Sequence, residues 1–503
     1  MSYSRTEYAK LNIMYGYLRK VVLTFLEFFS RVIFIDTLGE EILGVNGVFI
    51  NILQVLSLTE LGIGNVVLYS FYQPLAVGDK CKLKSLILFY KKIYHKIAFA
   101  VLIIGIAIIP FLHNIINLHK EIPNLYIIYF LFLSNTIFSY FFIYKNSLLK
   151  ADQKGYMVTK IEIPLIIIKI IIQILSLKLY SSFIIYLLID NIMTLIINYS
   201  ISKKVNKEYS YINDRYEELN SQEQKEIKNT IKSSFIYKVS GVILNSTDNI
   251  LVSMIIGTGV VGYLVNYKTI YVGIASFYTV LFTSLTASIG NLIETSDVEH
   301  RFKIFNVLLL ISSWLGIVLS SCFFILADSF IALWIGEKYI LDTSVVLCIS
   351  ITIFMSCVLH PIFIYREAMG LYKKVKYVML LAAIVNIILS IILGKIFGLV
   401  GILLGTIIAT LITYVWYEPI VLYNDCFSSD SKGYFRGRIK DCVFFIILIL
   451  ILLHIKDLIY ADSWIMWIIK AVSLFIVANI YCFIVYKNTK EFALIKNRIK
   501  QYY

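Results

Sequence analysis

The segment 97–116 reads IAFAVLIIGIAIIPFLHNII and contains no Asp, Glu, Lys or Arg. A helix of about twenty residues rises roughly 30 Å, which is the thickness of the hydrocarbon core of a bilayer. Lys91, Lys92 and Lys96 precede the segment, whereas Lys120 is the first cation after it. The segment therefore predicts a membrane-spanning helix whose Lys-rich end faces the cytoplasm.

The whole chain shares the apolar character of this segment. It has 503 residues, of which 59% are apolar and 16% are charged, whereas soluble domains have about 45–50% apolar and about 25% charged residues. The mean hydropathy is +0.80. With only 24 Gly and 6 Pro, a collagen-like or disordered chain is excluded as well. We expect an all-α, polytopic membrane protein.

Apolar segments long enough to cross a bilayer recur along the chain, and we predict fourteen of them. An even number places both termini on the same side of the membrane. The segments are 18–37, 43–71, 97–116, 123–144, 157–177, 180–201, 235–256, 260–290, 304–327, 340–364, 376–394, 397–419, 442–458 and 463–486.

The cations alternate between the connections in step with these segments. Five cations near segment ends are counted with the adjoining terminus or connection: Arg19, Lys20, Lys160, Lys376 and Lys456. Of the 46 Lys and Arg residues, 36 then lie in the two termini and the even-numbered connections, 5 lie in the odd-numbered connections, and 5 lie inside the segments. Because cytoplasmic loops concentrate Lys and Arg, both termini are predicted to be cytoplasmic. The net charge of +14 would suggest nucleic acid in a soluble protein, but here topology explains it and the bilayer is the expected partner.

Weak internal repeats suggest two six-helix halves with the same topology. Gly39 and Gly44 flank the first outer turn with the same spacing as Gly257 and Gly262 flank a later one. Transporters are often built from such repeats, with the binding site between the halves. The expected organisation is an N-terminal lobe, a cytoplasmic amphipathic linker, a C-terminal lobe, and two added helices with a cytoplasmic tail: 1–201, 202–234, 235–419 and 420–503.

Charged side chains inside membrane segments are costly and mark candidate functional sites. Glu162, Lys169 and Gln173 share one face of the segment 157–177. Lys169 is too deep to reach the interface easily. One interpretation is that Lys169, with Gln173, faces a cavity and attracts phosphate. The alternative is a buried pair between Lys169 and a carboxylate on another helix.

Two acidic residues of the first two segments are candidates for ion or proton coupling. Glu27 lies four residues before Arg31, so the two can neutralise each other, although Arg31 could instead bind phosphate in a bidentate manner. Glu60 lies on the polar face of the segment 43–71, where it could bind a proton or cation, or cap a structural network near the inner end.

The segment 235–256 carries a polar face made of Asn245, Asp248, Asn249 and Ser253. Asp248 lies near the segment's centre and is the strongest candidate for a coupling carboxylate, with Asn245 and Asn249 beside it. The alternative is an interhelical hydrogen-bond cluster with a structural role.

Enzyme motifs are nearly absent from the sequence. The chain has neither a GxxxxGK[ST] loop nor an HExxH pair, so it is not expected to hydrolyse ATP itself or to hold a catalytic zinc. We expect a protein that is not an enzyme and that uses no cofactor and no metal.

A series of short motifs runs along the chain from about Asn12 to Pro419. The motifs are FSR at 29–31, LGVNG at 43–47, LSLTELGIG at 56–64, YQPLA at 72–76, KADQK at 150–154, NSTDN at 245–249, FIALWIG at 330–336 and WYEP at 416–419. This series resembles the polysaccharide repeat-unit flippases of the Wzx type, within the MOP exporter superfamily that includes MATE exporters and lipid II flippases.

This resemblance implies two six-helix lobes that form a V around a central cavity, with alternating access driven by an ion or proton gradient. The cargo would be an undecaprenyl-pyrophosphate-linked oligosaccharide that crosses the cytoplasmic membrane for surface polysaccharides such as O-antigen or capsule. Arg31 and Lys169 match the cavity cations of the family. A polysaccharide polymerase and a chain-length regulator are the further partners it suggests.

Two other functions remain alternatives. A MATE-like multidrug or cation antiporter has the same fold, and requires a mostly apolar cavity with acids and without paired cations. A membrane glycolipid polymerase requires a large outer loop with catalytic residues, whereas the predicted outer connections are short.

Overall fold

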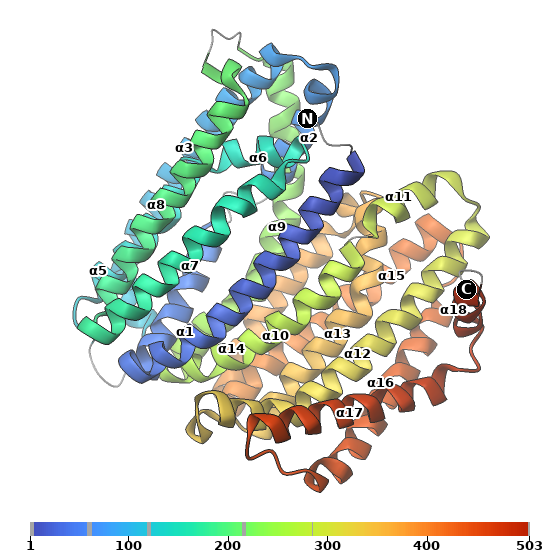
Figure 1. The fold of residues 1–503 in the computed structure, drawn as a ribbon. Helices are drawn as coiled ribbons and strands as arrows, with labels where there is room; N and C mark the ends of the chain where they lie inside the picture. Colours follow the sequence, from blue (N-terminus) through green and yellow to red (C-terminus); the bar gives the residue numbers. More distant parts are fainter. Residues whose placement is uncertain (1–4, 58–62, 118–121, 214–217, 284, 501–503) are drawn as a thin grey trace. The chain divides into compact units, whose positions relative to one another are not determined.

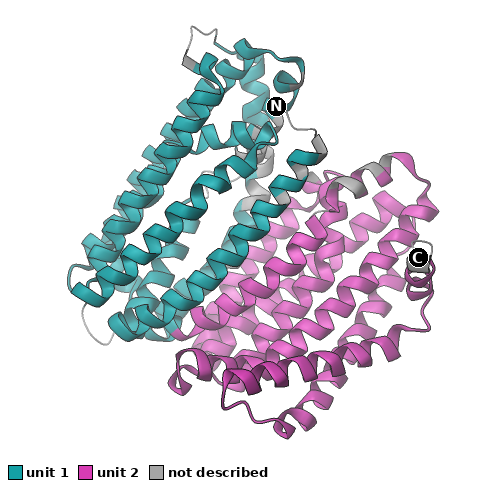
Figure 2. Ribbon diagram, in the orientation of Figure 1, with its two compact units in different colours: residues 1–262 teal, residues 263–503 magenta. Residues whose placement is uncertain are grey.

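The computed structural model describes residues 5–57, 63–117, 122–213, 218–283 and 285–500. The described residues form helices and contain no strand (Figure 1). The chain forms two compact units, residues 1–262 and 263–503 (Figure 2). The all-α class predicted from composition is confirmed.

The first unit contains the helices up to α9, and α10 begins within it and continues into the second unit. Their bounds are α1 (Arg5–Leu56), α2 (Ile63–Val77), α3 (Lys80–Ile108), η2 (Ile109–Phe111), α4 (Leu112–Ile115), α5 (Leu125–Tyr140), α6 (Ile143–Ala151), α7 (Gly155–Tyr180), α8 (Phe183–Glu208), η3 (Ser210–Asn213), α9 (Ser221–Ile255) and α10 (Thr258–Thr283).

The second unit contains the remaining helices, of which α16 and α17 correspond to the last two predicted segments. Their bounds are α11 (Thr286–Thr295), α12 (Val298–Ile335), η4 (Glu337–Tyr339), α13 (Thr343–Ala368), α14 (Tyr372–Ile412), α15 (Tyr414–Leu422), η5 (Tyr423–Phe427), α16 (Lys432–Ile455), η6 (Lys456–Leu458), α17 (Trp464–Tyr486) and α18 (Lys490–Lys500).

Helix overlaps every one of the fourteen predicted segments. Within the described residues, seven helices are long and apolar enough to cross a membrane, or eight if the bent pair α5 and α6 is one span. The protein is therefore a multi-pass membrane protein, while the number fourteen stays a prediction. The predicted domain boundaries also stay predictions, since the first unit extends to Gly262 and includes α9.

Two long helices are each broken at a glycine, one in a predicted turn between segments and one just inside a predicted segment. In α1 the break is Gly39, with φ 81° and ψ 174°, and in α14 it is Gly398, with φ 60° and ψ −136°. Side chains disfavour positive φ because Cβ crowds the backbone, so glycine is the residue that turns the chain at these points. The break at Gly39 separates the predicted segments 18–37 and 43–71, whereas the break at Gly398 lies at the start of the predicted segment 397–419.

The two repeated outer turns of the first unit pack against each other through glycines. A Cβ atom on Gly44 would collide with the carbonyl oxygen of Thr258, and one on Gly262 would collide with the carbonyl oxygen of Glu40. The two contacts are reciprocal, because the spacing that relates Gly44 to Gly262 also relates Glu40 to Thr258. The repeat seen in the sequence thus has a packing reason.

The turn between α9 and α10 is also fixed by hydrogen bonds to the end of α4. The Thr258 amide donates to the Asn117 carbonyl at 2.8 Å, and the Ser253 hydroxyl donates to the Ile115 carbonyl at 2.6 Å. These bonds satisfy backbone groups that the end of a membrane helix would otherwise leave without partners. The turn is therefore held from two sides, by α1 and by α4.

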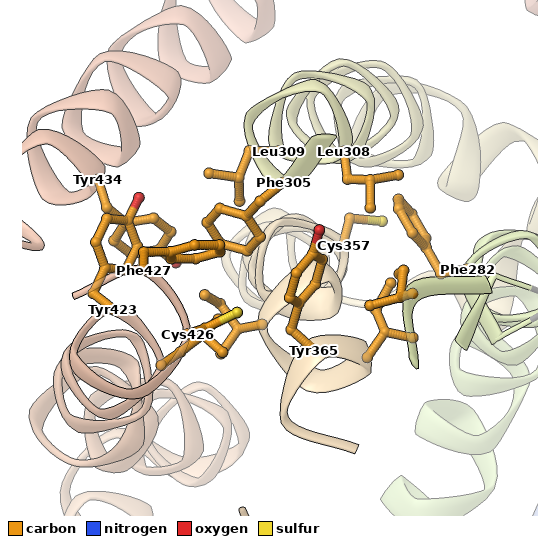
Figure 3. Packing of buried hydrophobic residues seen from close by; sticks show 14 of the residues in the cluster. Phe282, Phe305, Leu308, Leu309, Cys357, Tyr365, Tyr423, Cys426, Phe427 and Tyr434 are labelled. Carbon is orange, nitrogen blue, oxygen red and sulfur yellow. The ribbon is translucent and has the colours of Figure 1, made fainter. Parts of the chain in front are cut away.

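The core of the second unit is an aromatic cluster (Figure 3). The ring centroid of Phe305 lies 4.9 Å from that of Phe427 and 5.0 Å from that of Tyr365. Tyr434 of α16 lies at one edge of the cluster and is 5.9 Å from Tyr423. The rings join α12, α13 and α16 with geometries that the aromatic quadrupole favours.

Replacement of Gly44 by Ala tests the reciprocal glycine contact. The added methyl group meets a backbone oxygen that side-chain rotation cannot remove, so we expect Gly44→Ala to lower the free energy of unfolding by about 1–3 kcal/mol. The matched control is Gly16→Ala on the same helix, because no atom lies within 4 Å of a Cβ at Gly16. Thermal unfolding of both purified variants should show a loss for Gly44→Ala alone; equal melting temperatures would contradict the contact.

Candidate functional site

A polar cavity of about 520 Å³ lies within the first unit, between α1, α5, α7 and α8. Its polar lining comes from all four helices, and Ile50, Leu53, Phe132 and Leu187 complete the wall. The polar lining residues are Glu27, Asn46, Gln54, Ser57, Asn135, Thr136, Lys169, Tyr186 and Asp190.

A charged pair spans this cavity from α7 to α8. The Nζ atom of Lys169 lies 2.8 Å from Oδ1 of Asp190, and both side chains are 22% exposed. The side-chain amide of Asn135 donates to the other carboxylate oxygen of Asp190. Lys169 therefore combines the two interpretations made from the sequence, because it has a carboxylate partner on another helix and also lines a cavity.

Two neighbours of Lys169 on α7 make contacts of their own. The side chain of Gln173 is buried and its Nε2 donates to the Tyr186 carbonyl at 3.3 Å. Glu162 instead accepts from Nε of Arg19 at 2.9 Å. Two residues predicted to share one helical face therefore contact different helices: Gln173 contacts α8, which lines the cavity, and Glu162 is paired with α1.

Glu27 lines the same cavity from α1 and its side chain is exposed. Arg31, one turn further along α1, interacts electrostatically with Glu27 and with Tyr186. Since both of these residues line the cavity, Arg31 adjoins it. The structure thus brings Glu27, Arg31 and Lys169, which are far apart in sequence, to one region of the first unit.

The polar face of α9 lies against α1. The side-chain amide of Asn51 donates to the Ser246 carbonyl at 3.0 Å, and the amide of Asn249 donates to the Asn51 side chain at 3.5 Å. The hydroxyl of Ser246 donates to Oε1 of Gln54 at 3.0 Å. Asp248 is buried within the same helix segment. The α1–α9 cluster therefore adjoins the cavity through Gln54, which lines it.

Two of the predicted coupling residues lie outside what the structure describes. Glu60 is in the undescribed range 58–62, and the side chain of Asn245 is likewise outside the described atoms. Their roles stay predictions.

Asp190 is the cavity residue that the reading of the sequence missed. It is the one acidic residue in the segment 180–201, which is a signal because a lone carboxylate in hydrocarbon requires a partner. A second buried pair was also missed. Arg366 Nη1 contacts both carboxylate oxygens of Glu418, at 2.8 and 2.7 Å, and the two side chains are 5% and 2% exposed. Glu418 belongs to the WYEP motif, so this motif has a structural role.

The KADQK motif forms an ion cluster between α6 and the end of α8. The ammonium group of Lys154 lies 2.8 Å from Asp152 and 3.0 Å from Glu208, and the Tyr209 hydroxyl donates to Asp152 at 2.6 Å. Burial opposes the charge on Lys154, but its bonds to the two carboxylates outweigh burial and raise its pKa. Burial and the bond to Asp152 raise the pKa of Tyr209. This cluster fixes the connection that precedes α7.

No protein-family model matches the sequence, and no curated protein matches it either. Solved structures do match. The structure titled "Lipid II flippase MurJ, inward closed conformation" has a TM-score of 0.69 and 18% identity, and covers 95% of this chain and 99% of its own. The chain has the fold of the MOP-type transporters. An inward-facing multidrug resistance MATE transporter of the MOP superfamily has a TM-score of 0.59 and 14% identity, covering 78% of this chain and 93% of its own.

A third match shows the same fold. The Vibrio cholerae MATE transporter VcmN has a TM-score of 0.56 and 13% identity, covering 84% of this chain and 99% of its own. At these identities the similarity establishes the fold, which agrees with the superfamily that the sequence motifs resemble. The Wzx-type specificity within this superfamily is a separate question.

A double-variant cycle tests the Lys169–Asp190 pair. Replacing one member leaves the other charge partly buried without its partner, which costs up to about 3–5 kcal/mol, whereas replacing both with apolar residues removes the problem. We therefore expect Lys169→Met to unfold at a lower temperature than the double variant Lys169→Met/Asp190→Leu. The control is Lys303→Met, whose partner Glu299 is 75% exposed and whose loss should change little. A double variant less stable than both single variants would refute this coupling.

Proposed function

We propose that the protein is a flippase that moves an undecaprenyl-pyrophosphate-linked oligosaccharide from the cytoplasmic to the outer leaflet of the cytoplasmic membrane. In this proposal it acts as a transporter and not as an enzyme. The observation that carries the proposal is the match to a lipid II flippase over 95% of this chain and 99% of the flippase. The sequence motifs of the Wzx type support an oligosaccharide repeat unit as the cargo.

A MATE-like antiporter is the second candidate, because three-dimensional similarity to MATE transporters is also present. The extent of the match favours the flippase. The inward-facing MATE structure leaves more than a fifth of this chain unmatched, whereas the lipid II flippase leaves about a twentieth. The cations at the cavity also favour an anionic cargo over the cationic drugs of an antiporter.

The cavity of the first unit supplies groups suited to a pyrophosphate. Lys169 lines it and Arg31 adjoins it, and these two side chains offer ammonium and guanidinium donors that bind phosphate oxygens strongly. Gln173 fixes the backbone of Tyr186 beside them. We assign Lys169 and Arg31 to the pyrophosphate and Gln173 to positioning.

The pairing of Lys169 with Asp190 suggests how binding and an ion gradient are linked. While Asp190 is ionised it holds the Lys169 ammonium group at 2.8 Å. Protonation or cation binding at Asp190 would weaken this attraction and free Lys169 for a phosphate oxygen. Glu27 in the same cavity, and Glu60, Asp248, Asn245 and Asn249, are the further candidates for coupling.

The topology predicted from the cations completes the proposal. Both termini are placed in the cytoplasm of a bacterium, so the cargo enters from the leaflet where lipid-linked sugars are assembled. A polysaccharide polymerase and a chain-length regulator would act on the product at the outer face.

Deletion of the gene tests the function directly. We expect surface polysaccharide to be lost and lipid-linked oligosaccharide to accumulate in the cytoplasmic leaflet, measured by extraction of the lipid and by its accessibility in sealed vesicles. Unchanged polysaccharide length and amount in a strain without a redundant exporter would refute the flippase. Extrusion of a cationic dye that depends on the intact gene, together with normal polysaccharide, would support the antiporter instead.

Complementation of that strain tests the role of Lys169. Lys169→Ala should lower export about tenfold or more, because it removes a charge-assisted hydrogen bond, while Lys169→Arg should retain part of the activity. Lys178→Ala is the control, since Lys178 is an exposed cation of the same helix. The double variant Lys169→Met/Asp190→Leu separates folding from function: it should be stable and inactive. Full export by stable Lys169→Ala protein would remove Lys169 from the site.

Replacement of Glu27 tests coupling. Glu27→Gln keeps the size of the side chain but cannot be ionised, so we expect export to fall several-fold and to lose its dependence on the proton gradient. Export would be measured in energised vesicles with and without an uncoupler. Glu41→Gln, an acid of the same helix outside the cavity lining, should behave as the unmodified protein. Unaltered uncoupler sensitivity in Glu27→Gln would show that this residue does not couple transport.

A further inference from the structure

A second cavity, of about 530 Å³, lies within the second unit between α12, α16, α17 and α18. It is separate in the chain from the cavity of the first unit, and the proposed transport does not use it. Its lining includes the apolar residues Leu310, Phe444 and Val485 and polar groups of the first turns of α16.

Asp441 is a charged residue of this lining whose two carboxylate oxygens both have partners. Its carboxylate accepts from the Ser313 hydroxyl at 2.8 Å and from the Tyr486 hydroxyl at 2.6 Å, and it lies 3.0 Å from Nη2 of Arg438. Nη1 of Arg438 also donates to the Ser313 hydroxyl at 2.7 Å. These bonds fix the position of the Arg438 guanidinium group at the cavity wall.

Two donors beside this network have no hydrogen-bond partner among the described residues. They are the hydroxyl of Tyr434, whose side chain is 4% exposed, and the Nε–H of Arg438. The guanidinium carbon of Arg438 lies 5.3 Å from the Tyr434 ring centroid, so the two donors are neighbours. Buried donors without partners are rare, because each costs free energy. Both side chains line the cavity, where an acceptor oxygen would satisfy them.

The cavity lining carries both signs of charge and leaves free space near this position. Lys440 lines the cavity and is exposed, while the acids Asp430 and Glu491 also line it. Asp430 lies 3.1 Å from Lys432, which neutralises it. Gly433 and Gly437 line the cavity, and no atom lies within 4 Å of a Cβ built on either. The glycines therefore leave room for a group beside Tyr434 and Arg438.

We propose that this cavity binds the phosphate group of an anionic phospholipid of the cytoplasmic leaflet. The phosphate oxygens accept from Tyr434 and from Nε of Arg438, Lys440 approaches from the rim, and the apolar lining residues contact the start of an acyl chain. The position of the cavity along α16 agrees with this ligand. The helix begins at the cation-rich connection that is predicted to be cytoplasmic, and the phosphate groups of the inner leaflet lie at the same depth. Basic pockets between helices at this face bind anionic head groups.

Binding to delipidated protein tests this site, with native mass spectrometry as the readout. Dioleoyl-phosphatidylglycerol should bind at one site with an affinity about tenfold or more above that of dioleoyl-phosphatidylcholine, whose choline offsets the phosphate charge. Tyr434→Phe should weaken phosphatidylglycerol binding about tenfold without lowering the melting temperature of the lipid-free protein, because the lost hydroxyl has no partner there. Gly437→Leu should abolish binding by filling the cavity.

Tyr481→Phe is the matched control, because the Tyr481 hydroxyl already donates to the Phe444 carbonyl at 3.1 Å. It should bind phosphatidylglycerol as the unmodified protein does. Unchanged affinity in both Tyr434→Phe and Gly437→Leu would overturn the site. Inorganic phosphate that competes with phosphatidylglycerol at equal concentration would overturn the lipid and show a site for free phosphate, and equal affinity for the two lipids would overturn the requirement for net negative charge.

Discussion

A polar group in hydrocarbon has no water to bind, and this constraint governs the molecule at every level. The backbone satisfies it through helices, which form their hydrogen bonds internally. Two turns of the backbone show how this is achieved. At Gly39 a positive φ angle turns the chain. In the turn before Thr258, a hydrogen bond to the end of a neighbouring helix satisfies the backbone. The charged side chains satisfy the constraint through pairs such as Lys169 with Asp190 and Arg366 with Glu418.

The same constraint explains what the sequence can predict. Apolar segments and cation-rich connections follow from the energetics of single helices in a bilayer, so helices overlap all predicted segments. Gly39 marked a turn in the sequence because local conformation limits positive φ to few residue types. The helix ends inside a segment could not be predicted, because a long apolar run does not show where a helix ends. The segment 43–71, for example, contains the end of α1 at Leu56 and the start of α2 at Ile63.

The partners of charged residues depend on which helices become neighbours, and this is a property of the tertiary structure. The spacing of Glu27 and Arg31 on one helix could be read from the sequence. The pairing of Lys169 with Asp190 could not, because α7 and α8 could meet in several registers. Asp190 nevertheless carried a signal as the lone acid in its segment, and the reasoning applied to Glu27, Glu60 and Asp248 extends to it.

The two cavities differ in how far they meet this constraint. In the first unit Lys169 is paired with Asp190, which also accepts from Asn135, so the proposed cargo would compete with an existing pair. In the second unit Tyr434 and Arg438 present donors that lack a partner among the described residues, so a ligand there displaces no protein contact. A competed site suits a cargo that must be released in each cycle, whereas a site with preformed, unoccupied donors suits a ligand that stays bound.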